Sequence, residues 1–449
     1  MKMTTQLDSD NIRGLVLGLA LPSMTAQFVS VLYSIVDRMY IGNIPVIGET
    51  ALAGVGICGP IVTMIAALAS MVGIGGGPLV SIRLGAGREQ EAQKILSNCF
   101  VFLTCIALCA TLGAYLLKDQ LLRWFGASET VFPYAEQYMS VYLAGTVFAL
   151  LSVGMNQFII CQGYSRTAMY AVVIGAVSNI ILDPVFIFVL KMNVAGAALA
   201  TVLSQFFSCM FVLHFLFSKK PRLRIQLQRM EAKIIKNVFL VGLTPFLIIA
   251  FDNVILIALN AMITKYGGGT RGDMLLTCNT ILQSFMLIVT MPLGGITGGT
   301  QTILGFNYGA RRPDKIKNAQ KWILLLSLLF CTVLFFIAQF VPQFFIYIFT
   351  RDPEYVSMTK SIIRVYTRGI IFLALQYTIV DGFTGMGVYK YAFVLSAWRK
   401  LLYFGCVFLI PLFADVSNLF YCEPVSDIGG PIASVILYLT LGRKLLRRL

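Results

Sequence analysis

The chain has 449 residues, of which 58% are hydrophobic and only 12% are charged. Soluble domains carry about 25% charged residues on average. This composition therefore excludes a soluble fold and places most of the chain in a lipid bilayer. The net charge of +15 then reports membrane topology and not an affinity for nucleic acid.

Twelve apolar segments can each form a membrane-spanning helix, which needs about 20 residues. We expect them at residues 14–42, 51–80, 95–117, 134–160, 168–190, 194–217, 237–263, 274–304, 321–349, 358–384, 390–413 and 428–442. Strands are excluded for most of these segments, because an open sheet edge cannot be exposed to lipid. The predicted fold class is an all-α integral membrane protein with twelve transmembrane helices.

The basic residues predict the orientation of the chain. With the N-terminus in the cytoplasm, 23 of the 35 Lys and Arg residues fall on the cytoplasmic side, 7 fall on the other side and 5 fall within spans. Cytoplasmic segments of membrane proteins are enriched in Lys and Arg. We therefore expect both termini in the cytoplasm.

An internal repeat divides the chain. The longest polar segment, residues 218–236, is expected to link an N-terminal six-helix lobe, residues 1–217, to a C-terminal six-helix lobe, residues 237–449. Short motifs recur about 224 residues apart, as in residues 83–86 and 307–310. Six spans per lobe give both lobes the same orientation, a parallel repeat that is typical of transporters whose substrate passes between two halves.

Ionisable residues inside spans are the first functional candidates, because each costs about 2.5–3.5 kcal/mol to insert. Asp37 lies deep in the first span. A structural ion pair with Arg38 is the alternative, but adjacent helix residues do not share a face. We therefore expect a functional role for Asp37.

Asp183 lies four residues after Asn179, on the same helix face. The next residue, Pro184, cannot donate a hydrogen bond and clashes with the carbonyl of Ile180. A bent helix with a freed carbonyl beside a carboxylate and an amide can hold Na⁺ or a proton. The alternative is a proline kink that Asn179 stabilises.

The second half has no counterpart of this pair. The offset places Tyr403 opposite Asn179 and Val407 opposite Asp183. The ionisable cluster is therefore expected in the N-terminal half alone. Asp252 and Asn253, in the seventh span, are a candidate second site for a cation or for the substrate.

Other functions find little support. One His, no nucleophile elbow and no Cys/His ligand spacing argue against a membrane enzyme. The phosphate-binding motif GxxxxGK[ST] is absent, so ATP bound by this chain is not the energy source. We expect no cofactor apart from H⁺ or Na⁺ as the coupling ion.

Several longer motifs, taken together, are specific. They are LALPSMTAQFVSVLYSIVDRMYIG, GGGPLVSIRLGAGREQEA, SNIILDPVFIF followed by VAGAALAT, GGITGGTQTILGFNYGARRPDKIK and EPVSD. With them the chain resembles, over nearly its whole length, the MATE family of multidrug and toxic compound extrusion transporters. The resemblance implies two bundles with a central cleft and drug export driven by Na⁺ or H⁺.

The resemblance also implies site residues. The most similar bacterial branch has a cation site in its N-terminal lobe, and the matching positions here are Asp37, Asn179, Asp183, Asn156 and Thr201. Without the resemblance, interhelical hydrogen bonds would explain the last two. Another branch uses acids of the C-terminal lobe: Asp252 stands at its seventh-helix position, and Gln376 replaces its tenth-helix acid.

The predicted function is secondary active multidrug efflux by H⁺/drug or Na⁺/drug antiport with rocker-type alternating access. We expect small, often cationic, aromatic drugs or toxic metabolites as substrates, a monomer, and a location in the plasma (inner) membrane. The alternative is a flippase for a lipid-linked precursor in the same superfamily. A major-facilitator transporter would carry a basic loop motif that is missing here, and a channel would show no coupling.

Overall fold

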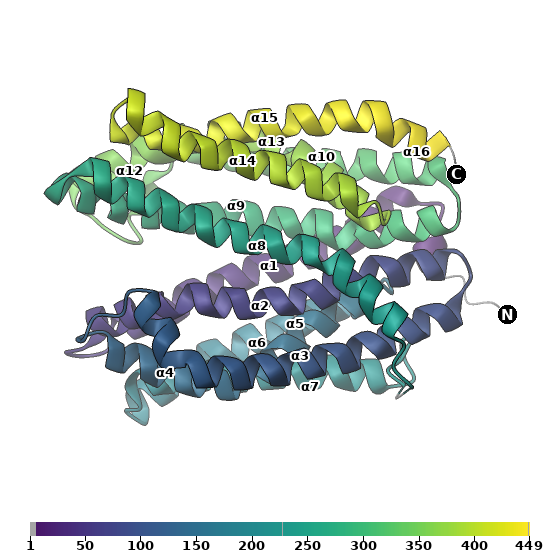
Figure 1. The fold of residues 1–449 in the computed structure, drawn as a ribbon, viewed down its shortest axis with the longest axis horizontal. Helices are drawn as coiled ribbons and strands as arrows, with labels where there is room; N and C mark the ends of the chain where they lie inside the picture. Colours follow the sequence, from purple (N-terminus) through teal and green to yellow (C-terminus); the bar gives the residue numbers. More distant parts are fainter. Residues whose placement is uncertain (1–5, 227, 448) are drawn as a thin grey trace. The chain divides into compact units, whose positions relative to one another are not determined.

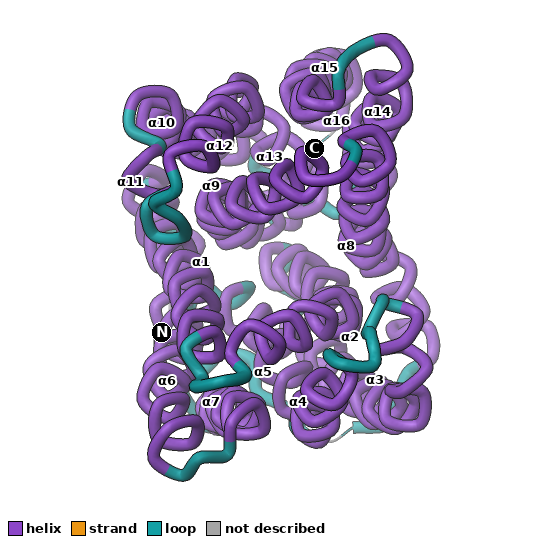
Figure 2. Tube along the Cα trace, turned by 90° about the vertical axis from the view of Figure 1, so that its left-hand side faces the viewer, coloured by secondary structure: helices purple, strands orange, loops and turns teal. Residues whose placement is uncertain are grey.

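The computed structural model describes residues 6–226, 228–447 and 449, and this part of the chain contains helices and loops but no strand (Figures 1 and 2). The first half contains α1 (Ile12–Gly42), α2 (Gly48–Gly85), α3 (Glu89–Trp124), α4 (Phe132–Ala144), α5 (Thr146–Ile160), α6 (Ser165–Pro184) and α7 (Asn193–Phe217). The second half contains α8 (Ala232–Gly267), α9 (Gly269–Gly309), α10 (Pro313–Phe340), α11 (Gln343–Ile346), α12 (Pro353–Tyr366), α13 (Ile370–Gly385), α14 (Tyr389–Phe413), α15 (Cys422–Leu437) and α16 (Arg443–Arg447).

The described residues form eleven helical segments that are long and apolar enough to cross a membrane. The helices α4 and α5 together make a twelfth span, bent by 58°. The predicted all-α membrane fold is therefore confirmed. The last span differs from its predicted bounds of 428–442, since α15 already begins at Cys422.

The chain forms two compact units, residues 25–249 and residues 1–24 together with 250–449. In the first unit, α2 packs against α3 and α5, and α7 packs against α4, α5 and α6. In the second unit, α9, α10 and α13 pack on one another, and α14 packs along α15. Leu293, Leu373 and Phe420 lie in the buried core of this second unit. The lobe boundaries expected from the sequence stay a prediction.

Helix boundaries repeat with the spacing that the motifs predict. Helices α3 and α10 begin 224 residues apart, at Glu89 and Pro313. The left-handed backbone positions that close a helix repeat in the same way: Gly87 corresponds to Arg311, and Gly163 to Gly387. Two chain segments that turn at matching positions support the predicted internal repeat.

The fourth span of each half contains an equivalent glycine at a break between helical segments. Gly145 separates α4 from α5, and Gly369, 224 residues later, precedes α13. Both glycines allow close helix contact. A Cβ atom at Gly145 would come within 2.5 Å of Val202, and one at Gly369 within 2.5 Å of the Asp427 Cβ atom.

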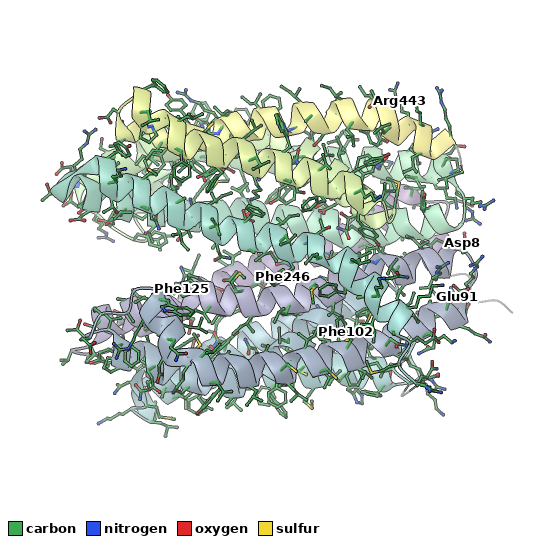
Figure 3. The ribbon with its side chains drawn as sticks, in the orientation of Figure 1. Asp8, Glu91, Phe102, Phe125, Phe246 and Arg443 are labelled. Carbon is green, nitrogen blue, oxygen red and sulfur yellow. The ribbon has the colours of Figure 1, made fainter. Side chains whose placement is uncertain are left out.

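The N-terminal residues are fixed to one end of the second unit. Asp8 pairs with Arg312, and Asp10 pairs with Lys315 at 2.7 Å. The hydrogen bond from Lys315, together with its charge, holds the pKa of Asp10 below its ordinary value. Asp8 and Arg443 lie at the same end of this unit (Figure 3), so the two ends of the chain share one side.

Gly145→Ala tests the importance of the close contact at the bend. Overpacking against a stiff Val side chain costs about 1–3 kcal/mol, so we expect a clearly lower melting temperature in detergent. Gly113→Ala in α3 is the matched control, because nothing lies within 4 Å of its added Cβ atom. Equal melting temperatures for the two variants would contradict the close packing at Gly145.

Candidate cation-coupling site

The N-terminal unit brings together two acidic side chains from different helices. Asp37 comes from α1 and Asp183 from α6, and the two side chains are close enough to interact electrostatically. The Asp183 side chain is fully buried. Two carboxylates make such a contact only when a proton or a cation lies between them, because like charges at this distance repel. The pair is therefore a candidate cation-binding centre.

Asn179 connects this centre to α7. Its Nδ2 atom donates to Asp183 Oδ1 at 3.2 Å and to Thr201 Oγ1 at 3.4 Å. Asn179 is 1% exposed. Three residues predicted from the sequence thus meet directly, on α6 and α7.

The local fold of α6 follows from Pro184. The proline ends α6, and residues Val185–Val189 continue as one wide π-helical turn in which the Leu190 N–H donates to the Val185 carbonyl at 2.9 Å. A proline lacks the N–H that would continue the α-helical pattern. This change in winding directly follows Asp183, and Asn179 donates to side chains instead of bridging the break.

Three acceptor atoms in the centre have no hydrogen-bond partner. They are Asp37 Oδ1, Asn179 Oδ1 and Asp183 Oδ2, each of them buried. An unsatisfied buried polar atom costs about 1–3 kcal/mol, and more when it is charged. Oxygen acceptors suit both a proton and Na⁺. The arrangement can therefore take up either ion.

The alternative ion pair for Asp37 does not form. The ion pairs within the described part of the chain do not include one between Asp37 and Arg38, and Arg38 is exposed. Two tyrosines that the sequence did not single out lie close instead. Tyr138 on α4 lies close to Thr201, and both Tyr138 and Tyr33 interact electrostatically with Asp37. No motif in the sequence marks them.

Asn156 lies apart from this group. Its Nδ2 atom donates to the Ala168 carbonyl at 3.3 Å, which joins α5 to α6. Ala168 precedes Asn179 by eleven residues, which is about 16 Å along a helix. Since the structure does not bring Asn156 to the two acids, its part in cation binding stays a prediction.

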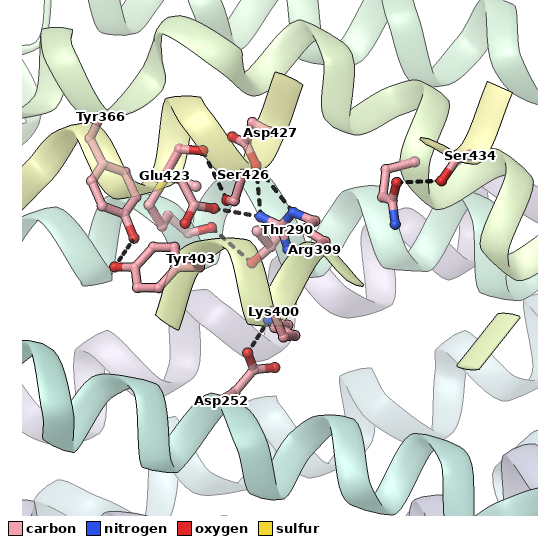
Figure 4. A network of polar contacts seen from close by, with 12 residues as sticks. Asp252, Thr290, Tyr366, Arg399, Lys400, Tyr403, Glu423, Ser426, Asp427 and Ser434 are labelled. Carbon is pink, nitrogen blue, oxygen red and sulfur yellow. Dashed lines mark hydrogen bonds and ion pairs between the residues drawn. The ribbon is translucent and has the colours of Figure 1, made fainter. Parts of the chain in front are cut away.

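The candidate second site is also dispersed. Asp252 on α8 forms an ion pair with Lys400 on α14, and Asn253 follows it on α8. Gln376 is buried and bridges helices elsewhere, accepting from Ser434 at 2.6 Å and donating to the Leu395 carbonyl at 3.4 Å. Figure 4 shows Asp252 and Ser434 well apart.

The expectation that only the N-terminal half holds an ionisable cluster was wrong. Arg399 on α14 pairs with Glu423 at 2.6 Å and with Asp427 at 2.7 Å, both on α15 (Figure 4). We call these three residues the C-lobe triad. The sequence prediction started the last span at residue 428 and so treated both acids as loop residues. The signal was available: two acids four residues apart share a helix face, and Arg399 lies in a predicted span.

One more acid of the second unit is satisfied by neutral groups. Asp381 on α13 accepts from Thr297 Oγ1 at 2.5 Å and from Gln301 Nε2 at 3.1 Å, both on α9. Neutral donors stabilise a buried carboxylate only in part. Asp381 is thus a separate, half-buried acid of the second unit.

The family model for MatE matches residues 22–185 and 249–405, one segment in each half. The chain belongs to the MatE family. This membership confirms the resemblance, and the family and its structural neighbours are transporters. We therefore describe the protein as a multi-pass membrane transporter of this family.

Similar proteins carry different names. The multidrug export protein MepA of Staphylococcus haemolyticus is 21% identical over 82% of this chain and 79% of its own. A FAD transporter of Shewanella oneidensis is 26% identical over 81% of this chain and 80% of its own.

Solved structures share the fold. A multidrug resistance MATE family transporter in an outward-facing conformation matches with a TM-score of 0.91 at 23% identity, covering 100% of this chain and 99% of the other. A MOP superfamily transporter from Pyrococcus furiosus matches with a TM-score of 0.89 at 24% identity, covering 100% and 98%. Alignment over whole chains confirms the predicted fold class.

Arg399→Gln tests the ion pairs of the C-lobe triad. The change leaves two buried carboxylates without a counter-charge, and removing one partner of a buried pair typically costs about 3–5 kcal/mol. We expect a large loss of melting temperature in detergent. Adding Glu423→Gln and Asp427→Asn should restore most of it, because no buried charge then remains. A single variant as stable as the parent would contradict the buried pairing.

Proposed function

We propose that this MatE protein exports small organic molecules by proton antiport, with the proton carried between Asp37 and Asp183. The observation that supports it is the contact of two acidic side chains within a membrane span, surrounded by unpartnered acceptor atoms. One proton between the two carboxyl groups removes their repulsion and satisfies an acceptor on each side. Na⁺ is the alternative ion, with Asn179 and Thr201 as further oxygen ligands.

Coupling arises because the proton and a cationic drug compete for the negative charge of the Asp37–Asp183 pair. A protonated pair is a single anion, while the unprotonated pair carries two charges and attracts a cationic drug. Proton entry from outside therefore weakens the attraction and favours release of the drug. It also changes the contact between α1 and α6, which alternating access between inward-open and outward-open states requires.

The energy is sufficient for useful export. One proton moving down about 100 mV supplies about 2.3 kcal/mol. At about 1.4 kcal/mol per tenfold ratio, this sustains roughly a 50-fold gradient of a neutral drug. One-for-one exchange with a monovalent cation moves no net charge, so that only the pH gradient drives it.

We propose multidrug efflux as the activity, with small, often cationic, aromatic compounds as substrates, because MepA is named as a multidrug export protein. The relative named as a FAD transporter makes an anionic dinucleotide the second candidate substrate. The flippase alternative predicts no transport of either water-soluble compound. We further propose that the protein acts as a monomer.

The proposed location is the plasma membrane with both termini in the cytoplasm. The bias of 23 basic residues against 7 supports this orientation. The N-terminal acids Asp8 and Asp10 also pair with Arg312 and Lys315, which belong to a segment that the same analysis places in the cytoplasm.

Ethidium efflux from cells that express the protein tests the proposal. We expect Asp37→Asn and Asp183→Asn each to slow efflux at least tenfold, since a neutral partner abolishes the shared proton. Asp119→Asn, an exposed acid of α3, is the matched control and should retain the parent rate. Expression of every variant is checked by quantitative blotting.

The same assay identifies the ion. In Na⁺-free medium, we expect faster efflux at external pH 6 than at pH 8, and no further effect of added Na⁺. Dependence on Na⁺ without dependence on pH would replace the proton by Na⁺. Full efflux in both Asp variants would contradict the site itself.

A further inference from the structure

The C-lobe triad carries unequal charge. Arg399 donates from Nε and Nη2 to Asp427 Oδ1, at 3.2 and 2.7 Å, and from Nη2 to Glu423 Oε1 at 2.6 Å. One cation therefore faces two carboxylates. The side chains are 11% exposed for Arg399, 9% for Glu423 and 0% for Asp427. A net charge of −1 is enclosed in the unit.

The neighbours do not compensate this charge. Lys400 is already paired with Asp252, so that pair adds nothing to the balance. The other titratable groups that face the triad from α10, α12, α13, α14 and α15 are thiols and phenols, which are neutral: Cys331, Tyr366, Tyr377, Tyr403 and Cys422. Asp381, which interacts with Tyr377, adds a further negative charge. The excess therefore persists over the whole packed region.

Asp427 has one carboxylate oxygen that accepts no hydrogen bond. Its Oδ2 atom is buried and has no hydrogen-bond partner, while Oδ1 takes both bonds from Arg399. The residue packs against Gly369, where an added Cβ atom would lie 3.3 Å from Oδ2. Within the part of the chain that the structure describes, no group of three His, Cys, Asp or Glu residues could hold a metal ion. An enclosed, crowded carboxylate oxygen suits a proton better than a metal ion, which would need several ligands.

The place of the triad in the repeat points to transport. It lies on α14 and α15, which correspond to α6 and α7, the helices that carry Asn179, Asp183 and Thr201. Tyr403, the counterpart of Asn179, lies one turn after Arg399 and contacts Tyr366 across 3.2 Å. In both lobes this helix pair thus carries a buried acid: Asp183 on α6 in the first, and Glu423 and Asp427 on α15 in the second.

We propose that the C-lobe triad is a second proton-binding site, with Asp427 Oδ2 as the acceptor, and that its proton is exchanged during transport. The transport part rests on the proposed antiport function. In the step, the Asp427 carboxylate takes up one proton, an O–H bond forms at Oδ2, and the triad changes from −1 to neutral. Arg399 keeps its bonds to Oδ1 and to Glu423. Release reverses the step and needs no other reactant.

Trp398 is a built-in reporter for this step. It precedes Arg399, and its Nε1 atom donates to the Gly429 carbonyl on α15 at 3.4 Å. The chain has three Trp residues, so replacing Trp124 and Trp322 by Phe leaves Trp398 alone. Protonation of Asp427 changes the electric field at the indole and the contact between α14 and α15 beside it, and both changes alter the fluorescence of Trp398.

The test is a fluorescence titration of this single-Trp full-length protein in detergent between pH 5 and 9. We expect one pH transition, which Asp427→Asn abolishes and which Asp37→Asn leaves in place. Glu423→Gln should move the midpoint to lower pH, because Arg399 then faces a single carboxylate. The Glu423→Gln variant also tests the proposal if Asp427→Asn fails to fold. An unchanged transition in Asp427→Asn, or an unmoved midpoint in Glu423→Gln, would overturn the proposal.

The role in transport has its own readout. In proteoliposomes, two protons exchanged for one ethidium cation move net charge, so the exchange rate should rise with an imposed potential. Asp427→Asn should keep exchange and lose this voltage dependence. The same voltage dependence in variant and parent would contradict coupling. Absence of any ethidium exchange would instead count against the proposed antiport function, and the Trp398 titration would still decide the proton site.

Discussion

The constraint on which this structure depends is the cost of an ionised group inside a membrane. Lipid offers no hydrogen bonds and little screening, so each buried carboxylate needs a proton, a cation or donors from neighbouring helices. Asp37 and Asp183 have two acceptor atoms without donors. An ion bound between the two side chains would remove this cost, which is why the pair is the candidate coupling site.

The two lobes solve the same problem with different residues. The N-terminal lobe leaves its acid pair open to an ion and supports it with Asn179 and Thr201. The C-terminal lobe places Arg399 between Glu423 and Asp427, which neutralises one of the two charges. Arg is suited to this position because its planar group can donate to two carboxylates at once. The corresponding helix pairs α6–α7 and α14–α15 thus carry different buried groups: a single acid in the first, and two acids with a counter-charge in the second.

Much of the fold could be predicted because membrane insertion imposes a simple rule on the sequence. Long apolar runs gave the spans, and the spacing of 224 residues gave the repeat, which the left-handed positions Gly87 and Arg311 now support. Asn179 and Asp183 were predictable because residues four apart on one helix must share a face. Pairings between residues of distant segments could not be predicted. The partner of Asp252 is Lys400, 148 positions later, and no local pattern indicates it.

The missed C-lobe triad has a specific cause. Glu423 and Asp427 make the start of α15 resemble a polar loop, and only the contact with Arg399 explains how this segment can be a buried helix. A hydropathy average counts each charged residue by itself, whereas in the folded protein charged residues of neighbouring helices form ion pairs. Asn156 was a candidate through the family resemblance; its hydrogen bond joins two helices about three turns away from Asn179, so its part in cation binding stays a prediction.

Infrared difference spectroscopy tests the shared proton most directly. The spectrum of the purified full-length protein, in Na⁺-free buffer at neutral pH, is compared with those of Asp37→Asn and Asp183→Asn in the region of the protonated carboxyl C=O stretch. We expect the parent to show a protonated carboxyl band that both variants lose, because neither has a second acid that would require the proton. Difference spectra without this band would contradict a proton between Asp37 and Asp183 and, with it, the proposed basis of coupling.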